Sequence, residues 1–276
     1  MIDWYSVENH FFLNPKFPEA KSRFLRGMFD AVQDRFRSHL FLLTSGTTAQ
    51  SVQDFKWVAL SKEAFLCGAR AANQHLKSEA RDVWIHTLPE FHVGGLAIWA
   101  RSHLSGAQVV RLSQWKPQDF VELISTRKGT LASLVPAQVY DLIQGEWICP
   151  PSLRAIVVGG GALASALLQK GKALGWPLLP SYGMTEASSQ IATATLEGQD
   201  ASLHVLPHFS VEVVDAEGKL RIRGDSLLTA YVFSHAGQVQ VQDPKRDGWF
   251  YTEDRGFLQG QQLSVLGRTR DFIKIG

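Results

Sequence analysis

Two short segments of the chain place hydroxyl groups, glycine and a carboxylate where a nucleotide phosphate could bind. Thr44-Ser45-Gly46-Thr47-Thr48 follows a predicted strand, and Tyr182-Gly183-Met184-Thr185-Glu186 follows the apolar run 177–180. Glycine lets the backbone approach a phosphate closely, and the neighbouring N–H and O–H groups can donate to its oxygens. A carboxylate beside a hydroxyl suits Mg²⁺, which prefers carboxylate and phosphate oxygens. Each segment alone could also be an ordinary polar turn.

Two later segments and one histidine extend this set. Tyr251-Thr252-Glu253-Asp254 and Gly267-Arg268-Thr269-Arg270-Asp271 contain an acid and an arginine that could hold a ribose diol. His92 opens a predicted helix. Taken singly, each of these two later segments is more often a surface turn or an ion pair. A lone histidine at a helix start is more often a structural cap than a catalytic group.

The elements that must position these residues alternate in type up to about residue 195. Short apolar runs predict strands, and longer amphipathic runs between them predict helices. The predicted strands are 40–43, 83–88, 107–112, 130–135 and 155–158, and the predicted helices are 93–104, 117–127, 139–143 and 163–174. This alternation predicts an α/β layer, with a mainly parallel sheet and flanking helices.

After residue 190 the pattern becomes rich in short strands. They are predicted at 211–214, 219–223, 227–232, 239–241, 249–251 and 263–266. Turn signals such as Glu217-Gly218 and Asp247-Gly248 separate them. We therefore predict an α/β subdomain over 1–195 and a small antiparallel sheet or barrel over 196–267.

Composition narrows the class of protein. The 276 residues are 45% hydrophobic and 20% charged, and the net charge of +2 is too small and too dispersed for nucleic-acid binding. Cys67 and Cys149 lie far apart, which argues against a disulfide framework or a zinc site. Neither a signal peptide nor an apolar run of the roughly 18–20 residues that a membrane helix needs is visible. We expect a cytoplasmic protein without nucleic-acid or membrane partners.

Taken together and in this order, the segments resemble the adenylate-forming superfamily of acyl-CoA ligases, luciferases and peptide-synthetase adenylation domains. The matching segments are TSGTT, LPEFHVGG, VVGGG, SYGMTE, YTEDRG and GRTRDFIKIG. The similarity runs from about Leu40 to Gly276, and chance would not produce this order. Within the superfamily the chain looks most similar to the o-succinylbenzoate–CoA ligases of menaquinone biosynthesis, on the stretches 86–95, 131–138, 153–161 and 182–190.

The resemblance implies a nucleotide site. The residues that would contact ATP or AMP are Thr44, Ser45, Gly46, Thr47, Thr48, Lys56, Gly159, Gly160, Gly161, Tyr182, Gly183, Met184, Asp254 and Arg268. Among them, Tyr182 would stack on adenine, while Asp254 and Arg268 would bind the ribose hydroxyls. The serine, glycine and threonines of residues 45–48 would cradle the phosphates.

The resemblance also implies the catalytic and acid-binding residues. Thr185 would contact the α-phosphate, Glu186 would hold Mg²⁺, and His92 would lie beside the acid's carboxylate and gate the path of the CoA thiol. The candidates for binding the acid are His92, Ser133, Gln138, Ser188, Ser189 and Gln190. The implied reaction converts an acid, expected to be 2-succinylbenzoate, to acyl-AMP with ATP and then to a thioester with coenzyme A. Two alternatives remain open: another aryl- or fatty-acid CoA ligase, or a degenerate protein that binds a nucleotide or acyl-AMP without turnover.

The chain departs from the family pattern in three places. Residues 49–55 intervene before Lys56, the family's loop lysine, and the hinge position carries Arg270 where Asp or Lys is usual. The chain is also short at both ends. About 40 residues precede the phosphate loop, which suggests a naturally compact start. We expect 268–276 to be a linker toward an absent C-terminal domain that carries a catalytic lysine, so the chain alone should be poorly active.

Overall fold

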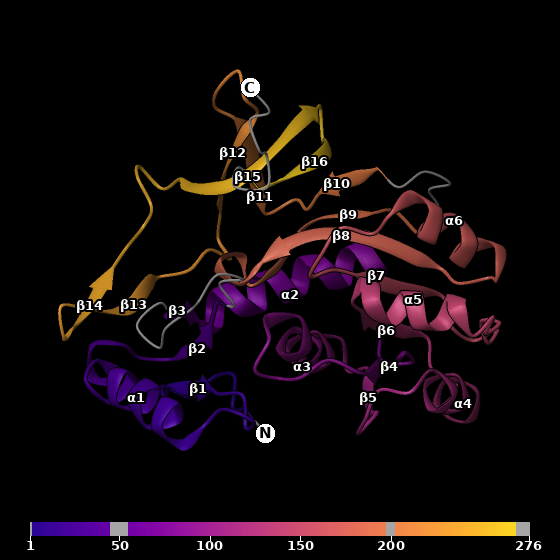
Figure 1. Cartoon of the computed structure of the whole chain (residues 1–276), viewed down its shortest axis with the longest axis horizontal. Coiled ribbons are helices and arrows are strands. Elements are labelled where there is room, and N and C mark those ends of the chain that lie inside the picture. Colours follow the sequence, from indigo (N-terminus) through magenta and orange to yellow (C-terminus); the bar gives the residue numbers. More distant parts are fainter. Residues whose placement is uncertain (1, 45–54, 197–201, 269–276) are drawn as a thin grey trace.

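The computed structural model describes residues 2–44, 55–196 and 202–268, and its strands form two sheets (Figure 1). Among the described residues, one sheet has five strands in the order β1-β2-β3-β13-β14 and the other has eleven in the order β11-β12-β15-β16-β10-β9-β8-β7-β6-β4-β5. The helices are α1 (Glu19–Asp30), α2 (Lys62–Leu76), α3 (Val93–Ser105), α4 (Pro117–Arg127), α5 (Pro136–Gln144) and α6 (Ser165–Ala173).

The larger sheet begins with the parallel layer that the sequence predicts. Its parallel strands are β4 (Val83–His86), β5 (Gln108–Arg111), β6 (Leu131–Leu134), β7 (Ala155–Val158) and β8 (Leu178–Met184). Alternate side chains enter different cores because successive residues of a strand point to opposite faces. Ile85 and Ile156 pack with α4, α5 and α6, whereas Trp84 and Val157 pack with α2 and α3. The predicted α/β fold class is confirmed.

The same sheet continues into an antiparallel part. The strands are β9 (Ser189–Ala194), β10 (Leu203–Val205), β11 (Phe209–Val213), β12 (Lys219–Gly224), β15 (Phe250–Gln259) and β16 (Gln262–Arg268). Strand β8 joins the two parts, because its first residues pair in parallel with β7 and its last residues pair antiparallel with β9. Residues 182–184 therefore belong to a strand, and the turn that we expected there is confined to the residues that follow.

The five-stranded sheet combines three strands from residues 10–61 with two strands from residues 230–242. It contains β1 (His10–Phe12), β2 (His39–Leu43), β3 (Lys56–Ser61), β13 (Ala230–His235) and β14 (Gln238–Gln242). Helix α1 covers this sheet, where Leu25 and Phe29 pack against Phe41 and Trp57. Strand β13 pairs antiparallel with β3, so strand pairing crosses the subdomain boundary predicted at residue 195. The division at that residue stays a prediction about subdomains, and it does not separate the sheets.

An ion pair joins the starts of three parallel strands. Asp82 precedes β4 and accepts hydrogen bonds from Arg154, which precedes β7, at 2.7 and 3.0 Å, and from Thr130, which precedes β6, at 2.7 Å. Arg154 also donates to the carbonyl oxygens of Leu76 and Lys77 at the end of α2. Because the Asp82 side chain is only 5% exposed, this network fixes the amino ends of the strands. Their carboxyl ends lead into the residues that we expect to do chemistry.

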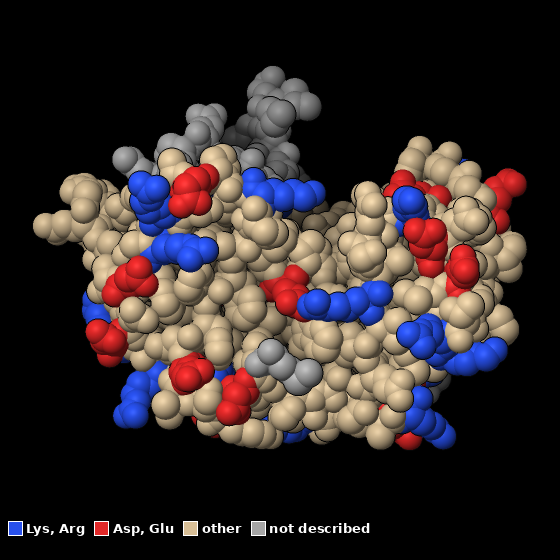
Figure 2. Space-filling view, turned by 90° about the horizontal axis from the view of Figure 1, so that it is seen from below, with Lys and Arg blue, Asp and Glu red and all other residues tan. Residues whose placement is uncertain are grey.

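Surface charge agrees with the sequence-based expectation. On the face seen in Figure 2, Lys and Arg side chains alternate with Asp and Glu, without a field of one sign. No helix among the described residues combines the length and the apolar character needed to cross a membrane.

Candidate nucleotide and acid site

The predicted catalytic pair Thr185 and Glu186 lies in a tight turn between β8 and β9. The turn is a single-turn 3-10 helix, Thr185–Ala187, and Ser188 and Ser189 leave it with φ values of 55° and 112°. Gly183 opposes this exit so closely that an added Cβ would overlap the backbone of Ser189. Glycine is therefore required at 183, and the turn presents the Glu186 carboxylate at the junction of the two sheets.

Glu186 contacts a residue that the motifs did not include. The hydroxyl of Tyr231, on β13, donates to Glu186 Oε1 at 2.8 Å. Burial raises the pKa of Glu186, while the hydrogen bond from Tyr231 and the charge of Arg268 act in the opposite direction. Burial, with the nearby Glu186 charge, also raises the pKa of Tyr231, so the tyrosine is the proton donor of the pair.

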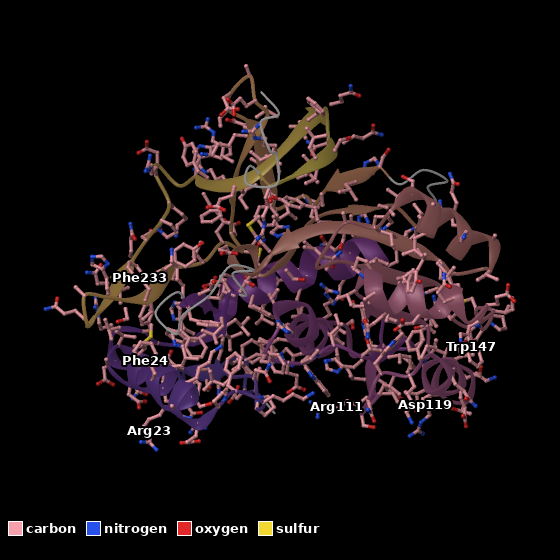
Figure 3. The ribbon with its side chains drawn as sticks, viewed as in Figure 1. Arg23, Phe24, Arg111, Asp119, Trp147 and Phe233 are labelled. Atoms are coloured by element: carbon pink, nitrogen blue, oxygen red, sulfur yellow. The ribbon has the colours of Figure 1, made fainter. Side chains whose placement is uncertain are left out.

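Lys56 approaches the same tyrosine from β3. Its Nζ lies 5.3 Å from the centre of the Tyr231 ring and 5.5 Å from that of Phe233, which Figure 3 labels on β13. The backbone N–H of Thr44 donates to the Lys56 carbonyl at 3.2 Å, so both ends of the predicted phosphate loop lie at this edge. Thr44, Lys56 and Glu186 are thus brought to one region. Ser45, Gly46, Thr47, Thr48 and the hinge residue Arg270 lie outside the described residues.

A second cluster contains the predicted ribose and adenine contacts. The Tyr182 hydroxyl donates to Asp254 Oδ2 at 2.7 Å, and Arg268 Nε lies 3.8 Å from Asp254 Oδ1. Asp254 and Arg268 are cross-strand neighbours on β15 and β16, which places them on one side of the sheet. Burial, followed by the charge of Asp254, raises the pKa of Tyr182 well above its ordinary value. Asp254 and Arg268 both act electrostatically on Glu186, so the two clusters are adjacent.

The glycine run follows β7 at the same edge. Gly159 donates its N–H to Leu134 at 3.1 Å, and a Cβ there would come within 3.0 Å of Ser181 Oγ. Gly160 has φ 77°, in the left-handed region that favours glycine. Gly159 thus keeps the space beside Ser181 of β8 free of a side chain, whereas a Cβ at Gly160 or Gly161 would lie near Val135 or Pro136.

Ser133 and Gln138 differ in whether their side-chain oxygens are already hydrogen-bonded. Ser133 lies within β6, is buried, and its Oγ has no hydrogen-bond partner among the described residues. Helix α5 starts at Pro136, earlier than the predicted 139, and Gln138 Oε1 accepts the Val135 N–H at 3.0 Å. The Gln138 oxygen thus caps a helix, while Ser133 still has a donor to offer.

His92 immediately precedes α3. Its side chain makes no capping hydrogen bond, so the structural alternative of a histidine cap does not apply. The ring contacts Phe91, with the ring centres 4.6 Å apart. Burial lowers the pKa of His92, so the imidazole is neutral at pH 7 and can accept or donate a hydrogen bond.

Arg101 is the residue that the motif analysis missed. It lies in α3, is only 2% exposed, and its guanidinium is 5.5 Å from the Trp84 ring. Nη2 donates to Ser189 Oγ at 3.3 Å, but Nε and Nη1 have no hydrogen-bond partner among the described residues. Burial lowers the pKa of Arg101 to about 10, so it remains charged at pH 7. The signal in the sequence was an arginine inside the otherwise apolar helix VGGLAIWARSHLS.

Two neighbours of Ser189 in the chain, Ser188 and Gln190, differ in how far their polar groups are satisfied. Gln190 is buried and donates to Thr193 at 2.5 Å, while its Oε1 has no partner among the described residues. Ser188 is used differently, because its hydroxyl donates to the Ser226 carbonyl at 2.8 Å. A buried cation with two unpaired N–H-bearing nitrogens is costly unless it binds an anion or water. The arrangement fits an anionic group of a ligand next to Arg101 and Ser189.

The donor set near Glu186 also fits Mg²⁺. Among the described residues, no group of three or more His, Cys, Asp or Glu side chains could hold a metal ion by itself. Mg²⁺ is commonly bound through one or two carboxylates together with substrate phosphates, rather than by a cage of protein ligands. Glu186, partly buried in the region that also holds Thr44 and Lys56, meets that requirement.

Comparisons with known proteins show which sequences and structures the chain is similar to. The 2-succinylbenzoate–CoA ligase of Bacillus mycoides is 29% identical over 250 residues, which cover 85% of this chain and 50% of that protein. The o-succinylbenzoate coenzyme A synthetase of Bacillus subtilis, solved in complex with ATP and magnesium ion, is 28% identical with a TM-score of 0.75, and the match covers 86% of this chain and 51% of that one. The same synthetase with the acyl-adenylate intermediate OSB-AMP has 27% identity and a TM-score of 0.74, over 84% of this chain and 49% of that one.

The chain therefore spans about half the length of these relatives. A family model described as AMP-binding enzyme matches residues 32–232, which include the β2–β3 hairpin, the Thr185–Glu186 turn and Tyr231. By this match, over most of its length, the chain belongs to the AMP-binding enzyme family.

Proposed function

We propose that this chain is the nucleotide- and acid-binding part of a ligase that activates a carboxylic acid with ATP and passes it to coenzyme A. The observation that carries the proposal is the meeting of Thr44 and Lys56, the Thr185–Glu186 turn and the Asp254–Arg268 pair at one edge. Membership of the AMP-binding enzyme family supports it, as do relatives named for this activity.

The proposed chemistry has two steps. A carboxylate oxygen of the acid attacks the α-phosphorus of ATP, which forms acyl-AMP and releases pyrophosphate. The CoA thiol then attacks the acyl carbon, and AMP leaves. Bound Mg²⁺ would neutralise phosphate charge, held through Glu186. The chain's own residues contribute positioning: Asp254 and Arg268 hold the ribose, Thr185 contacts the α-phosphate, and Lys56 adds positive charge.

We further propose that the acid is 2-succinylbenzoate. This acid has two carboxylates, of which only one is activated, so the other needs a charged anchor in an otherwise apolar pocket. Arg101 supplies such an anchor, because its guanidinium is buried and donates only one hydrogen bond among the described side chains, to Ser189. A fatty acid or plain benzoate would leave this charge unpaired. By the family resemblance, we expect the neutral imidazole of His92 to lie beside the carboxylate that is activated, on the path of the CoA thiol.

Ligand binding by the chain tests the proposal directly. A non-hydrolysable 2-succinylbenzoyl-AMP analogue at a hundredfold excess over its Kd should raise the free energy of unfolding by about 2.7 kcal/mol. The matched control is the same analogue carrying a fatty acyl group. If neither analogue stabilises the chain at millimolar concentration, the proposal that the chain binds a nucleotide is contradicted. If both analogues stabilise the chain equally, nucleotide binding is supported and only the proposal that the acid is 2-succinylbenzoate is contradicted.

The degenerate, non-catalytic alternative predicts the same binding, so turnover must separate the two. The altered segment between Thr48 and Lys56 favours that alternative, whereas the placement of Glu186 and Asp254 favours catalysis. The proposed partners are the acid, ATP and CoA, and we place the reaction in the cytoplasm, where ATP and CoA are supplied.

A further inference from the structure

The Glu186 turn is held by residues 226–231, the segment that leads into β13 of the five-stranded sheet. Leu228 donates its N–H to the Glu186 carbonyl at 2.8 Å, and Ser188 donates its hydroxyl to the Ser226 carbonyl at 2.8 Å. These contacts fix the backbone of the turn. They leave the Glu186 side chain to be fixed by another group.

The holding segment is itself anchored at its far side. Lys245 Nζ donates to the Leu228 carbonyl at 2.6 Å, and the His208 ring lies 2.8 Å from Ser226 Oγ. Ser226 is fully buried, so the segment is packed between the turn and these two side chains. It therefore provides a rigid support from which Tyr231 projects.

The Tyr231 hydroxyl supplies the side-chain contact. Phenylalanine would fill the same space, since the ring packs near Phe250 with the centres 6.5 Å apart. The oxygen adds a hydrogen bond of 2.8 Å to Glu186 Oε1. A carboxylate can rotate about its last torsion, and a donor on one oxygen restricts that rotation. Residues that hydrogen-bond a metal-ligating carboxylate orient it and raise metal affinity.

We propose that Tyr231 is a positioning residue for magnesium: its hydroxyl holds the Glu186 carboxylate in the orientation that binds the metal of Mg·ATP. This inference rests on the proposed role of Glu186 as the metal ligand. It adds a residue from outside the nucleotide-binding motifs, and it makes the β13–β3 pairing part of the metal site, because that pairing places Tyr231 over the turn.

Replacing the hydroxyl alone tests the proposal. In Tyr231→Phe, the magnesium concentration that gives half-maximal binding of a non-hydrolysable ATP analogue should rise roughly tenfold or more. Binding of AMP without metal should change less than about twofold, because Tyr231 contacts the carboxylate and not the nucleoside. Raising magnesium should restore analogue binding. Calorimetry and thermal shift, with magnesium varied at fixed analogue, give both quantities without requiring turnover.

Tyr5→Phe is the matched control, since Tyr5 is 76% exposed and distant in sequence from the site. It should behave like the unaltered chain. An unchanged magnesium requirement in Tyr231→Phe would overturn the proposal, and so would equal losses of AMP and analogue binding or a failure to fold. Glu186→Gln tests the proposed role of Glu186 as the metal ligand separately from the role of Tyr231. If it also leaves the magnesium requirement unchanged, the proposed role of Glu186 fails as well.

Discussion

At the scale of single residues, the described part of the site uses charges that folding has only partly satisfied. Arg101 is buried with Nε and Nη1 unpartnered among the described residues, and Glu186 is a partly buried carboxylate that accepts a hydrogen bond from Tyr231. Such groups cost stability when no ligand is bound, and they gain partners when an anion or a metal arrives. Strongly perturbed groups of this kind are typical of functional sites.

Arg101→Gln should therefore change specificity more than stability. Without the cation, binding of the 2-succinylbenzoyl-AMP analogue should weaken by roughly 2–5 kcal/mol, the usual cost of leaving one charge of a buried pair unpaired. Binding of AMP should be almost unaffected, because the proposed nucleotide contacts are Asp254 and Arg268. Calorimetric titration with the two ligands gives the comparison. Parallel losses for both would show that Arg101 serves folding rather than recognition of the acid.

At the scale of elements, strand order brings the residues together. The parallel strands end at one edge, and the Asp82–Arg154–Thr130 network fixes their opposite ends. Burial by itself would raise the pKa of Asp82, but hydrogen bonds from Arg154, the Glu79 amide and Thr130 outweigh it and lower the pKa below 3.8. A carboxyl whose pKa is lowered by folding stabilises the protein above its unfolded pKa, and this contribution is lost as the pH falls through the folded value.

Asp82→Asn should destabilise the chain in a pH-dependent way. Breaking a buried pair costs about 3–5 kcal/mol, and the partial exposure of Arg154 places the expected loss near the lower end. The difference from the unaltered chain should be equal at pH 7 and pH 5 and smaller at pH 3.5, because the unfolded chain takes up a proton at Asp82 more readily than the folded chain does. Urea denaturation at these pH values measures it. Asp119→Asn, on the exposed face of α4, should cost less than about 1 kcal/mol. A pH-independent difference would contradict the ionic account.

The elements also show what a sequence can predict. Helix 117–127 and strand 155–158 were predicted with their observed bounds, since Pro117 begins the helix and a run of buried aliphatic residues forms the strand. The pairing of β13 with β3 was not predictable, because periodicity identifies a strand but not its distant partner. Arg101 was hidden for a related reason: an apolar helix marks burial, and only tertiary packing shows which of its polar atoms lack partners.

At the scale of the whole molecule, the chain contains the residues proposed to bind nucleotide and acid, and it matches about half of its relatives' length. Developing negative charge on the carboxylate and α-phosphate needs a cation held in place. The family resemblance assigns that cation to a lysine of a C-terminal domain. In this sequence Lys274 falls in the predicted linker and Lys56 at the phosphate loop, so neither matches that lysine.

The 276-residue chain should therefore bind nucleotide but form thioester barely or not at all. The loss of one preorganised charge typically costs about 10²–10³ in rate. Extending the chain with the C-terminal domain of a relative, or supplying that domain separately, should recover activity. Pyrophosphate release and acyl-CoA formation, measured with and without the added domain, decide the matter. Full turnover by the chain alone would mean that another cation performs this task.

The return of β13 to the edge of β3 also governs the order in which the chain can fold. Ala59 pairs with Ala230, so the β2–β3 hairpin keeps an open edge until most of the sequence has left the ribosome. An open edge is a template for pairing with other chains, and contacts so distant in sequence form slowly. The tyrosine that holds Glu186 arrives on the same late strand. Closure of that edge and completion of the proposed metal site are therefore a single event in synthesis, and a nascent chain that lacks β13 has neither.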